Sequence, residues 1–140
     1  MDKATQLPII MYNVPGRTGQ NVSGETTIRI ANECKNIFAT KEACGNFDQI
    51  NYIIKNKPVD FMVISGDDPI TLPMIACGAE GLISVVANAY PEDYSNMVRL
   101  CIAGKFHEAK SIHYKYTDII TSMFAEGSPS GVKAYLSEMG

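Results

Sequence analysis

Several features that mark particular protein classes are missing from this sequence. Its four cysteines include no C-x-x-C pair, which argues against a zinc site or a disulfide framework. We interpret them as small buried hydrophobic residues. No apolar run approaches the roughly 18 residues needed to cross a bilayer. The first six residues lack the apolar core of a signal peptide. The sequence therefore predicts a cytoplasmic protein that does not span a membrane.

The sequence also lacks a large excess of positive or negative charge. The formal net charge is -3, and no stretch is rich in lysine and arginine. Nucleic-acid binding depends on a basic surface, so we expect no nucleic-acid partner. With 140 residues and a hydrophobic fraction of 46%, the chain can bury a core and is not expected to be disordered.

Short apolar runs alternate with segments of helical spacing over most of the chain. Near-continuous apolar strands that alternate with helices indicate a parallel sheet covered by helices. Ser23 and Asn46 are the expected N-caps of the first two helices. The expected strands lie within residues 7–14, 36–43, 60–65 and 81–87, and the expected helices within 25–33, 46–55, 69–78 and 91–104.

This repeat ends near Gly104. Residues 106–123 read as one long helix and residues 129–139 as a shorter one. We therefore predict an α/β fold of the (β/α)8 TIM-barrel family. Residues 1–104 would form a half-barrel of about four β/α units, and residues 105–140 a C-terminal helical segment, whereas a whole barrel usually takes about 250 residues. A flavodoxin-like open parallel sheet is the alternative, although no glycine-rich phosphate loop follows the first strand.

Three residues near the ends of the first two strands could carry chemistry. Burial of Lys41 among apolar neighbours would lower its pKa and make its amine a nucleophile. The phenol of Tyr12 could relay protons during imine formation, and Arg17 could receive a carboxylate. Taken singly, each has an ordinary explanation: a lysine that reaches solvent beside Glu42, a core tyrosine and a solvated arginine. Together they lie where barrel enzymes place their sites, which predicts Schiff-base chemistry on a keto acid.

A metal site is not expected. Asp67 and Asp68 precede Pro69, and we interpret them as helix-cap and dipole partners. No histidine or further carboxylate at useful spacing completes a cation site. His107 and His113 are interpreted as ordinary helix residues.

Four segments resemble successive motifs of the dihydrodipicolinate synthase family, within the N-acetylneuraminate lyase superfamily. Their order and approximate spacing are also those of the family, and the resemblance runs from about Leu7 to Gly140. It corresponds to the C-terminal half-barrel and part of the C-terminal helical region. Ser128 and Gly131 depart mildly from a turn that is more usually Asn-Pro-x-Pro. The segments are Tyr12-Asn13-Val14-Pro15-Gly16-Arg17-Thr18-Gly19, Thr40-Lys41-Glu42-Ala43-Cys44-Gly45, Ser65-Gly66-Asp67-Asp68 and Gly81-Leu82-Ile83-Ser84-Val85-Val86-Ala87-Asn88.

The resemblance implies roles for five residues. Lys41 matches the lysine that forms the pyruvate Schiff base, and Tyr12 matches the tyrosine of the proton relay. Arg17 matches the arginine that receives the carboxylate of aspartate semialdehyde. Gly66 and Ile83 match positions that line the pyruvate pocket, Ile83 through its backbone carbonyl. The implied activity is that of a class I aldolase-type lyase of lysine and diaminopimelate biosynthesis, with no cofactor beyond the covalent Schiff base on Lys41.

Two alternatives stay open at this point. The chain could be a related pyruvate aldolase that acts on N-acetylneuraminate or keto-deoxy sugar acids, although Arg17-Thr18-Gly19 and Lys41-Glu42-Ala43 favour the synthase. It could also be a catalytically inactive half-barrel that self-associates. The family's loop for the pyruvate carboxylate and a second relay tyrosine would both precede Leu7, so we expect a truncated form. Its expected macromolecular partners are further copies of itself, in a homo-oligomer, or a separate N-terminal half.

Overall fold

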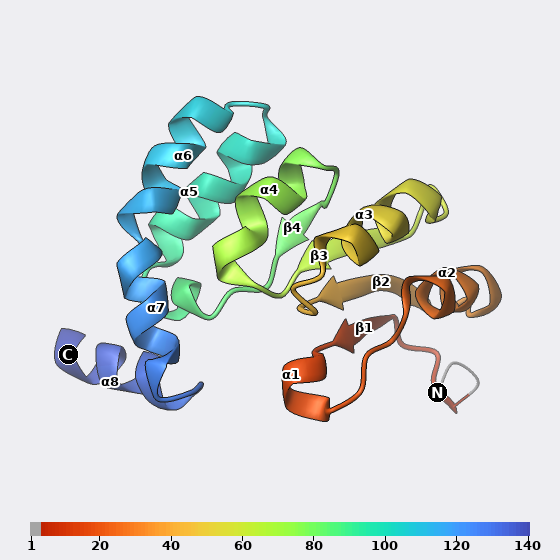
Figure 1. Ribbon diagram of the computed structural model, residues 1–140, viewed down its shortest axis with the longest axis horizontal. Coiled ribbons are helices and arrows are strands. Elements are labelled where there is room, and N and C mark those ends of the chain that lie inside the picture. The colour runs from red at the N-terminus through yellow and green to blue at the C-terminus, as the bar shows by residue number, and fades with distance from the viewer. Residues whose placement is uncertain (1–3) are drawn as a thin grey trace.

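The computed structural model describes residues 4–140, and its centre is a four-stranded parallel sheet (Figure 1). The strands are β1 (Ile9–Asn13), β2 (Ile37–Glu42), β3 (Met62–Ser65) and β4 (Gly81–Leu82), and they are neighbours in chain order. A flavodoxin-like sheet would require a reversal of strand order. The sequential order excludes that alternative and is the order of strands in a barrel.

Helices connect the strands as the sequence predicts. Ser23 and Asn46 cap α2 and α3, since their side chains accept hydrogen bonds from the backbone amides of Thr26 and Gln49. A one-turn helix, α1, follows β1. Short 3-10 helices follow β3 and β4. The ranges are α1 (Pro15–Thr18), α2 (Gly24–Glu33), α3 (Phe47–Asn56), η2 (Asp68–Ile70), α4 (Thr71–Ala76), η3 (Val86–Asn88) and α5 (Pro91–Ile102).

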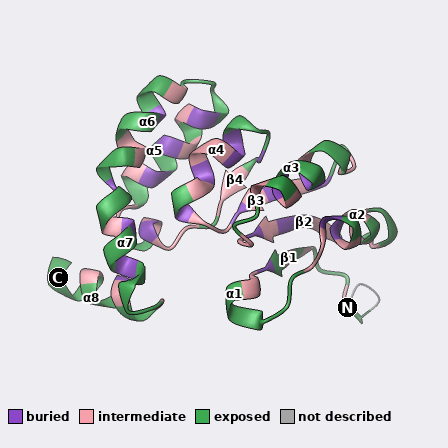
Figure 2. Ribbon diagram, in the orientation of Figure 1, coloured by how far each residue is buried: buried purple, intermediate pink, exposed green. Residues whose placement is uncertain are grey.

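The two faces of the sheet differ in burial because side chains alternate between them along each strand. On the outer face, Val63 packs in a core with Ile50 of α3 and Met74 of α4, and none of these side chains is exposed. On the opposite face, Ile10 and Tyr12 expose 39% and 45% of their surface. Buried residues accordingly concentrate on β2 and β3 and on the adjoining sides of α4 and α5 (Figure 2). The exposed face is the one that a complete barrel would enclose.

The prediction of one long helix over residues 106–123 was wrong. The chain forms α6 (Phe106–Lys115) and α7 (Thr117–Ala125), which meet at Tyr116. Tyr116 is buried, its ring lies 4.9 Å from that of Tyr90, and its hydroxyl donates to Asp93. The turn allows a large aromatic side chain to enter the core, so tertiary packing overrides the continuous helical pattern. The final helix, α8 (Ser130–Met139), agrees with the prediction.

The fourth strand is shorter than predicted. Pairing ends at Leu82, and the expected strand residues Val86 and Ala87 belong to η3. The buried carboxylate of Asp68 accepts hydrogen bonds from the Ser84 hydroxyl and the Val85 backbone amide. These bonds turn the chain away from the sheet directly after β4.

Candidate active site

Tyr12 and Lys41 meet on the open face of the sheet. Tyr12, Lys41 and Ile64 are register partners across β1, β2 and β3, so their side chains form one row. The Lys41 Nζ lies 4.2 Å from the centroid of the Tyr12 ring, in a cation–π contact. The predicted pairing of a phenol with a strand lysine is therefore present in the structure.

Gly66 borders the Lys41 side chain at the end of β3. Its backbone amide donates to the Glu42 carbonyl at 2.7 Å, which continues the sheet ladder beyond Ser65. A Cβ on Gly66 would lie only 2.8 Å from the Lys41 Cε and 2.9 Å from its Cγ. The absence of a side chain at Gly66 is what makes room for the lysine stem.

Ile83 and Arg17 approach this row from two directions. The Ile83 backbone amide donates to the Ser65 carbonyl at 2.9 Å, which holds Ile83 beside Gly66 with 44% of its surface exposed. Arg17 lies on α1, directly after β1, and its Nη1 donates to the Ser128 carbonyl at 3.3 Å. The α7–α8 turn thus helps to hold the guanidinium near the open face.

The environment of Lys41 lowers the pKa of its amine. Burial is the main cause, the Asp68 carboxylate opposes it, and the Arg17 guanidinium adds to it. Glu42 is not a salt-bridge partner of Lys41, because it lies on the other face of β2, where it is fully buried. The amine is thus held partly desolvated with a cationic neighbour, the two conditions that favour a neutral, nucleophilic lysine.

The interpretation of Asp67 and Asp68 as helix caps was wrong, although Asp68 does lie in the first turn of η2, where a dipole partner was expected. Asp68 is 2% exposed, and η2 has no side-chain cap bond from Asp67. Instead, Asp68 binds the Ser84 hydroxyl and accepts from the Val85 amide at 3.0 Å. Burial raises the pKa of the Asp68 carboxyl, which these hydrogen bonds and Lys41 partly oppose. Asp68 therefore ties the segment after β3 to the loop after β4, and its carboxylate attracts the charged form of the Lys41 amine.

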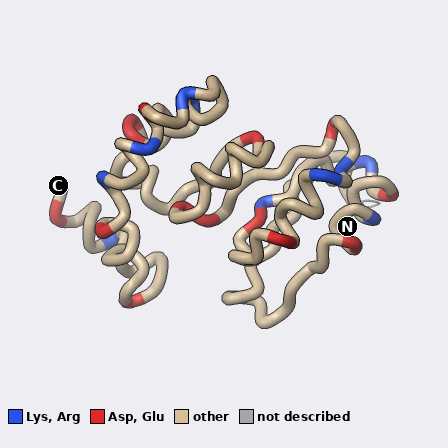
Figure 3. Tube along the Cα trace, turned by 45° about the horizontal axis from the view of Figure 1, so that its top comes forward, with Lys and Arg blue, Asp and Glu red and all other residues tan. Residues whose placement is uncertain are grey.

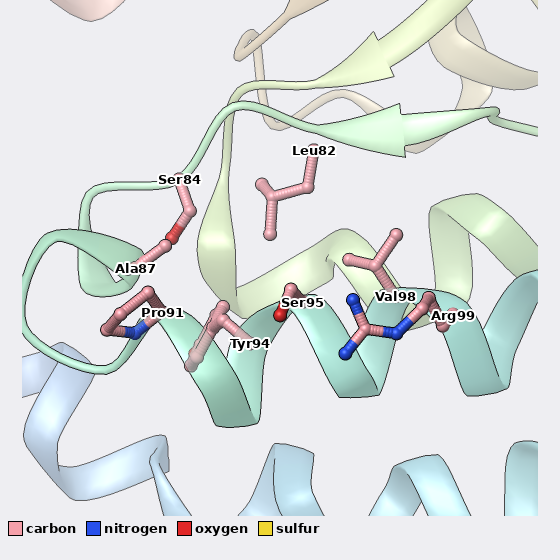
Figure 4. A pocket seen from close by; sticks show the side chains of 8 residues that line it. All are labelled: Leu82, Ser84, Ala87, Pro91, Tyr94, Ser95, Val98 and Arg99. Carbon is pink, nitrogen blue, oxygen red and sulfur yellow. The ribbon is translucent and has the colours of Figure 1, made fainter.

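A pocket of about 420 Å³ lies away from this row, between β4 and α5. Figure 4 shows Leu82 pointing from β4 toward α5, which supplies Tyr94 and Val98. None of the five predicted site residues lines it, because the open face of a half-barrel encloses no volume. The remaining lining residues are Ser84, Ala87, Pro91, Ser95 and Arg99.

Other kinds of site find no support in the described part of the chain. Among residues 4–140, no group of three or more His, Cys, Asp and Glu side chains is arranged to hold a metal ion. No helix there is long and apolar enough to cross a membrane. Acidic and basic residues are interspersed along the trace and form no continuous basic stripe (Figure 3).

The sequence matches the dihydrodipicolinate synthetase family over residues 1–140. The chain belongs to this family. It is 54% identical over 138 residues to the 4-hydroxy-tetrahydrodipicolinate synthase of Phocaeicola vulgatus, and this match covers 99% of the chain but 46% of that enzyme. The corresponding enzyme of Parabacteroides distasonis is 53% identical over 137 residues, with the same 46% covered.

Solved structures of the family agree with the fold. The dihydrodipicolinate synthase of Thermotoga maritima superposes with a TM-score of 0.96 at 38% identity, covering 99% of this chain and 48% of that one. A variant described as the first monomeric dihydrodipicolinate synthase gives 0.95 at 38% identity, with 99% and 47% covered. The chain thus spans about half the length of its relatives. Its correspondence to their C-terminal half stays a prediction, as do the individual roles of the five site residues.

Proposed function

We propose that this chain carries the Schiff-base centre of a 4-hydroxy-tetrahydrodipicolinate synthase, with Lys41 as the nucleophile. The observation that carries the proposal is the Lys41 Nζ, 4.2 Å from the Tyr12 ring centroid on the open face, with its pKa lowered by burial. Membership of the family and the room left by Gly66 support it. The substrates would be pyruvate and aspartate semialdehyde, and no cofactor is required by this chemistry.

The proposed reaction begins when the neutral Lys41 amine attacks the ketone carbon of pyruvate. Loss of water gives an imine, and loss of a methyl proton converts the imine to an enamine. The enamine carbon then forms a bond to the aldehyde carbon of aspartate semialdehyde, whose carboxylate Arg17 would receive. Attack of the substrate amine on the imine carbon closes the ring and releases the Lys41 amine. The Tyr12 phenol would carry the protons that these steps exchange.

We further propose that the open face is covered in the active protein. In residues 4–140, β1 and β4 each pair with one neighbouring strand, and unpaired strand edges invite association. Ile10, Tyr12 and Ile83 are exposed beside them. A complementary half-barrel or a second copy of this chain would supply the cover. The similarity to a monomeric family variant means that family membership alone does not fix the oligomeric state. A cytoplasmic location also stays a prediction.

Borohydride trapping with pyruvate tests the proposed nucleophile. The folded protein is incubated with pyruvate, reduced and measured by intact mass, and peptide mapping then locates the adduct. We expect one adduct per chain, on Lys41. No adduct from a folded sample, with or without the N-terminal half of a relative added as a separate polypeptide, would overturn the proposal.

Replacing Asp68 with asparagine should make Lys41 more reactive near neutral pH. An ionised Asp68 favours the charged amine, so its removal lowers the pKa of Lys41 further. The asparagine oxygen can still accept from the Val85 amide. The increase of the adduct-formation rate with pH should therefore begin at a lower pH in the variant than in wild type. This difference should fade below the raised pKa of Asp68, where the native carboxyl is protonated.

The control for this measurement is Asp60→Asn, which removes one carboxylate from an exposed position before β3. It should leave the pH profile unchanged. A shift of the Asp68→Asn profile to higher pH would contradict the electrostatic role assigned to Asp68.

A further inference from the structure

A second pair of side chains lies directly behind the candidate active-site pair. Asn13 and Glu42 follow Tyr12 and Lys41 in sequence and are also register partners across β1 and β2. Because side chains alternate, they occupy the outer face of the sheet while Tyr12 and Lys41 occupy the open face. Both are buried, with exposed fractions of 1% and 0%.

Glu42 is a fully buried carboxyl held only by uncharged groups. The Asn13 Nδ2 lies 3.2 Å from its Oε1 and 3.1 Å from its Oε2. The Thr40 hydroxyl is 3.5 Å from Oε1. No lysine or arginine forms an ion pair with Glu42 within residues 4–140. Burial without a cation is unfavourable for a carboxylate, which raises its pKa, so packing and these hydrogen bonds must hold it in place.

Asn13 extends this contact to the loop before α2. Its Oδ1 accepts from the Val22 backbone amide at 3.1 Å, and its Nδ2 lies 2.9 Å from the Asn21 Oδ1. Asn21 in turn accepts from and donates to Gln49 of α3. One asparagine therefore joins the end of β1, the end of β2 and the adjoining helical layer.

We propose that Asn13 and Glu42 form a cross-strand clamp that positions Tyr12 against Lys41. The clamp joins the strands at the residues next to the phenol and the amine, so its loosening changes their separation and admits water to Lys41. The effect of the clamp on catalysis rests on the proposed function of Lys41. Its effect on the Tyr12–Lys41 contact is independent of that function. Asn13 and Glu42 are positioning residues, since neither touches the reacting atoms.

Nuclear magnetic resonance of the ε-methylene group of Lys41 tests the geometry without any substrate. Because the Lys41 Nζ lies 4.2 Å from the Tyr12 ring centroid, the ring should shift these protons upfield. The signal is assigned by its loss in Lys41→Arg. Glu42→Ala should remove at least half of the upfield shift. Glu42→Gln should keep most of it, since the glutamine oxygen still accepts from Asn13. Ile50→Val, which trims a buried side chain of α3 outside the clamp, should lower thermal stability and leave the shift unchanged.

Asn13→Asp provides a test within a single folded variant. At low pH one proton shared by the two carboxyls keeps the strands together. As the pH rises, both carboxyls ionise and repel each other. The upfield shift of the Lys41 protons should therefore be lost in this variant, and the loss should exceed any change with pH in wild type. A full shift at every pH in Asn13→Asp, or in folded Glu42→Ala, would overturn the clamp.

Trapping with pyruvate separates the clamp from the proposed function. In Glu42→Ala, adduct formation at neutral pH should fall about tenfold, with its pH profile moved to higher pH as Lys41 becomes solvated. The Glu42→Gln rate should stay within about twofold of wild type. If the clamp variants change the Lys41 resonances but no protein, wild type included, forms an adduct, the proposed function is rejected and the clamp is retained. An adduct with unchanged resonances and rates would reject the clamp alone.

Discussion

Replacing Lys41 with alanine is expected to abolish the pyruvate adduct completely. The proposed imine needs a primary amine on the open face, and no other lysine in the described chain lies over Tyr12. The fold should survive, because the Lys41 amine makes no salt bridge in residues 4–140. The measurement is borohydride trapping followed by peptide mapping, with circular dichroism to confirm folding.

Two further variants sharpen this result. Lys41→Arg keeps the positive charge and most of the side-chain length but cannot form a stable imine, so it should also give no adduct. Lys55→Ala removes an exposed lysine from α3 and should react as wild type does. An adduct that persisted in Lys41→Ala would show that another amine is the nucleophile.

Replacing Gly66 with alanine should slow adduct formation by about 100-fold, because misplacement of a reacting group by about 1 Å can cost this much. The new Cβ would meet the Lys41 Cε at 2.8 Å, its Cγ at 2.9 Å and the Ala43 Cβ at 3.1 Å. The flexible lysine stem would have to move, and its amine would leave the Tyr12 ring. The measurement is the rate of trapping at saturating pyruvate.

Gly81→Ala is the matched control for this prediction. Gly81 lies on the neighbouring strand β4, and a Cβ there would have no atom within 4 Å. It should leave the trapping rate within about twofold of wild type, whatever small change in backbone flexibility it brings. Equal rates for Gly66→Ala and wild type would show that Lys41 does not need the space beside Gly66.

The sequence predicted the sheet and the Tyr12–Lys41 pair because both depend on local patterns. Strand and helix periods are visible in short windows, and the ends of successive parallel strands meet at one edge of a sheet. The caps at Ser23 and Asn46 were predicted for the same reason, since each cap bond joins residues three positions apart.

The features that the sequence did not predict depend on contacts between distant residues. Asp68 reads as a cap until Ser84, sixteen positions later, is seen against it. The break at Tyr116 depends on Asp93, twenty-three positions earlier. The buried pair of Asn13 and Glu42 had one available signal, a polar residue in each apolar strand next to the candidate catalytic residue. That signal becomes interpretable only when the strand register is known.

The chain-order sheet has a consequence for how this protein acquires its structure. Each strand pairs with the next strand along the chain, and only helices and loops lie between them, so no pairing has to wait for a more distant strand. Parallel strand pairs nonetheless join residues that lie far apart in sequence, so sheet formation is expected to be slower than the folding of the helices. The Tyr12–Lys41 pair needs only the first two strands, so it can form early, while the chain is still emerging from a ribosome.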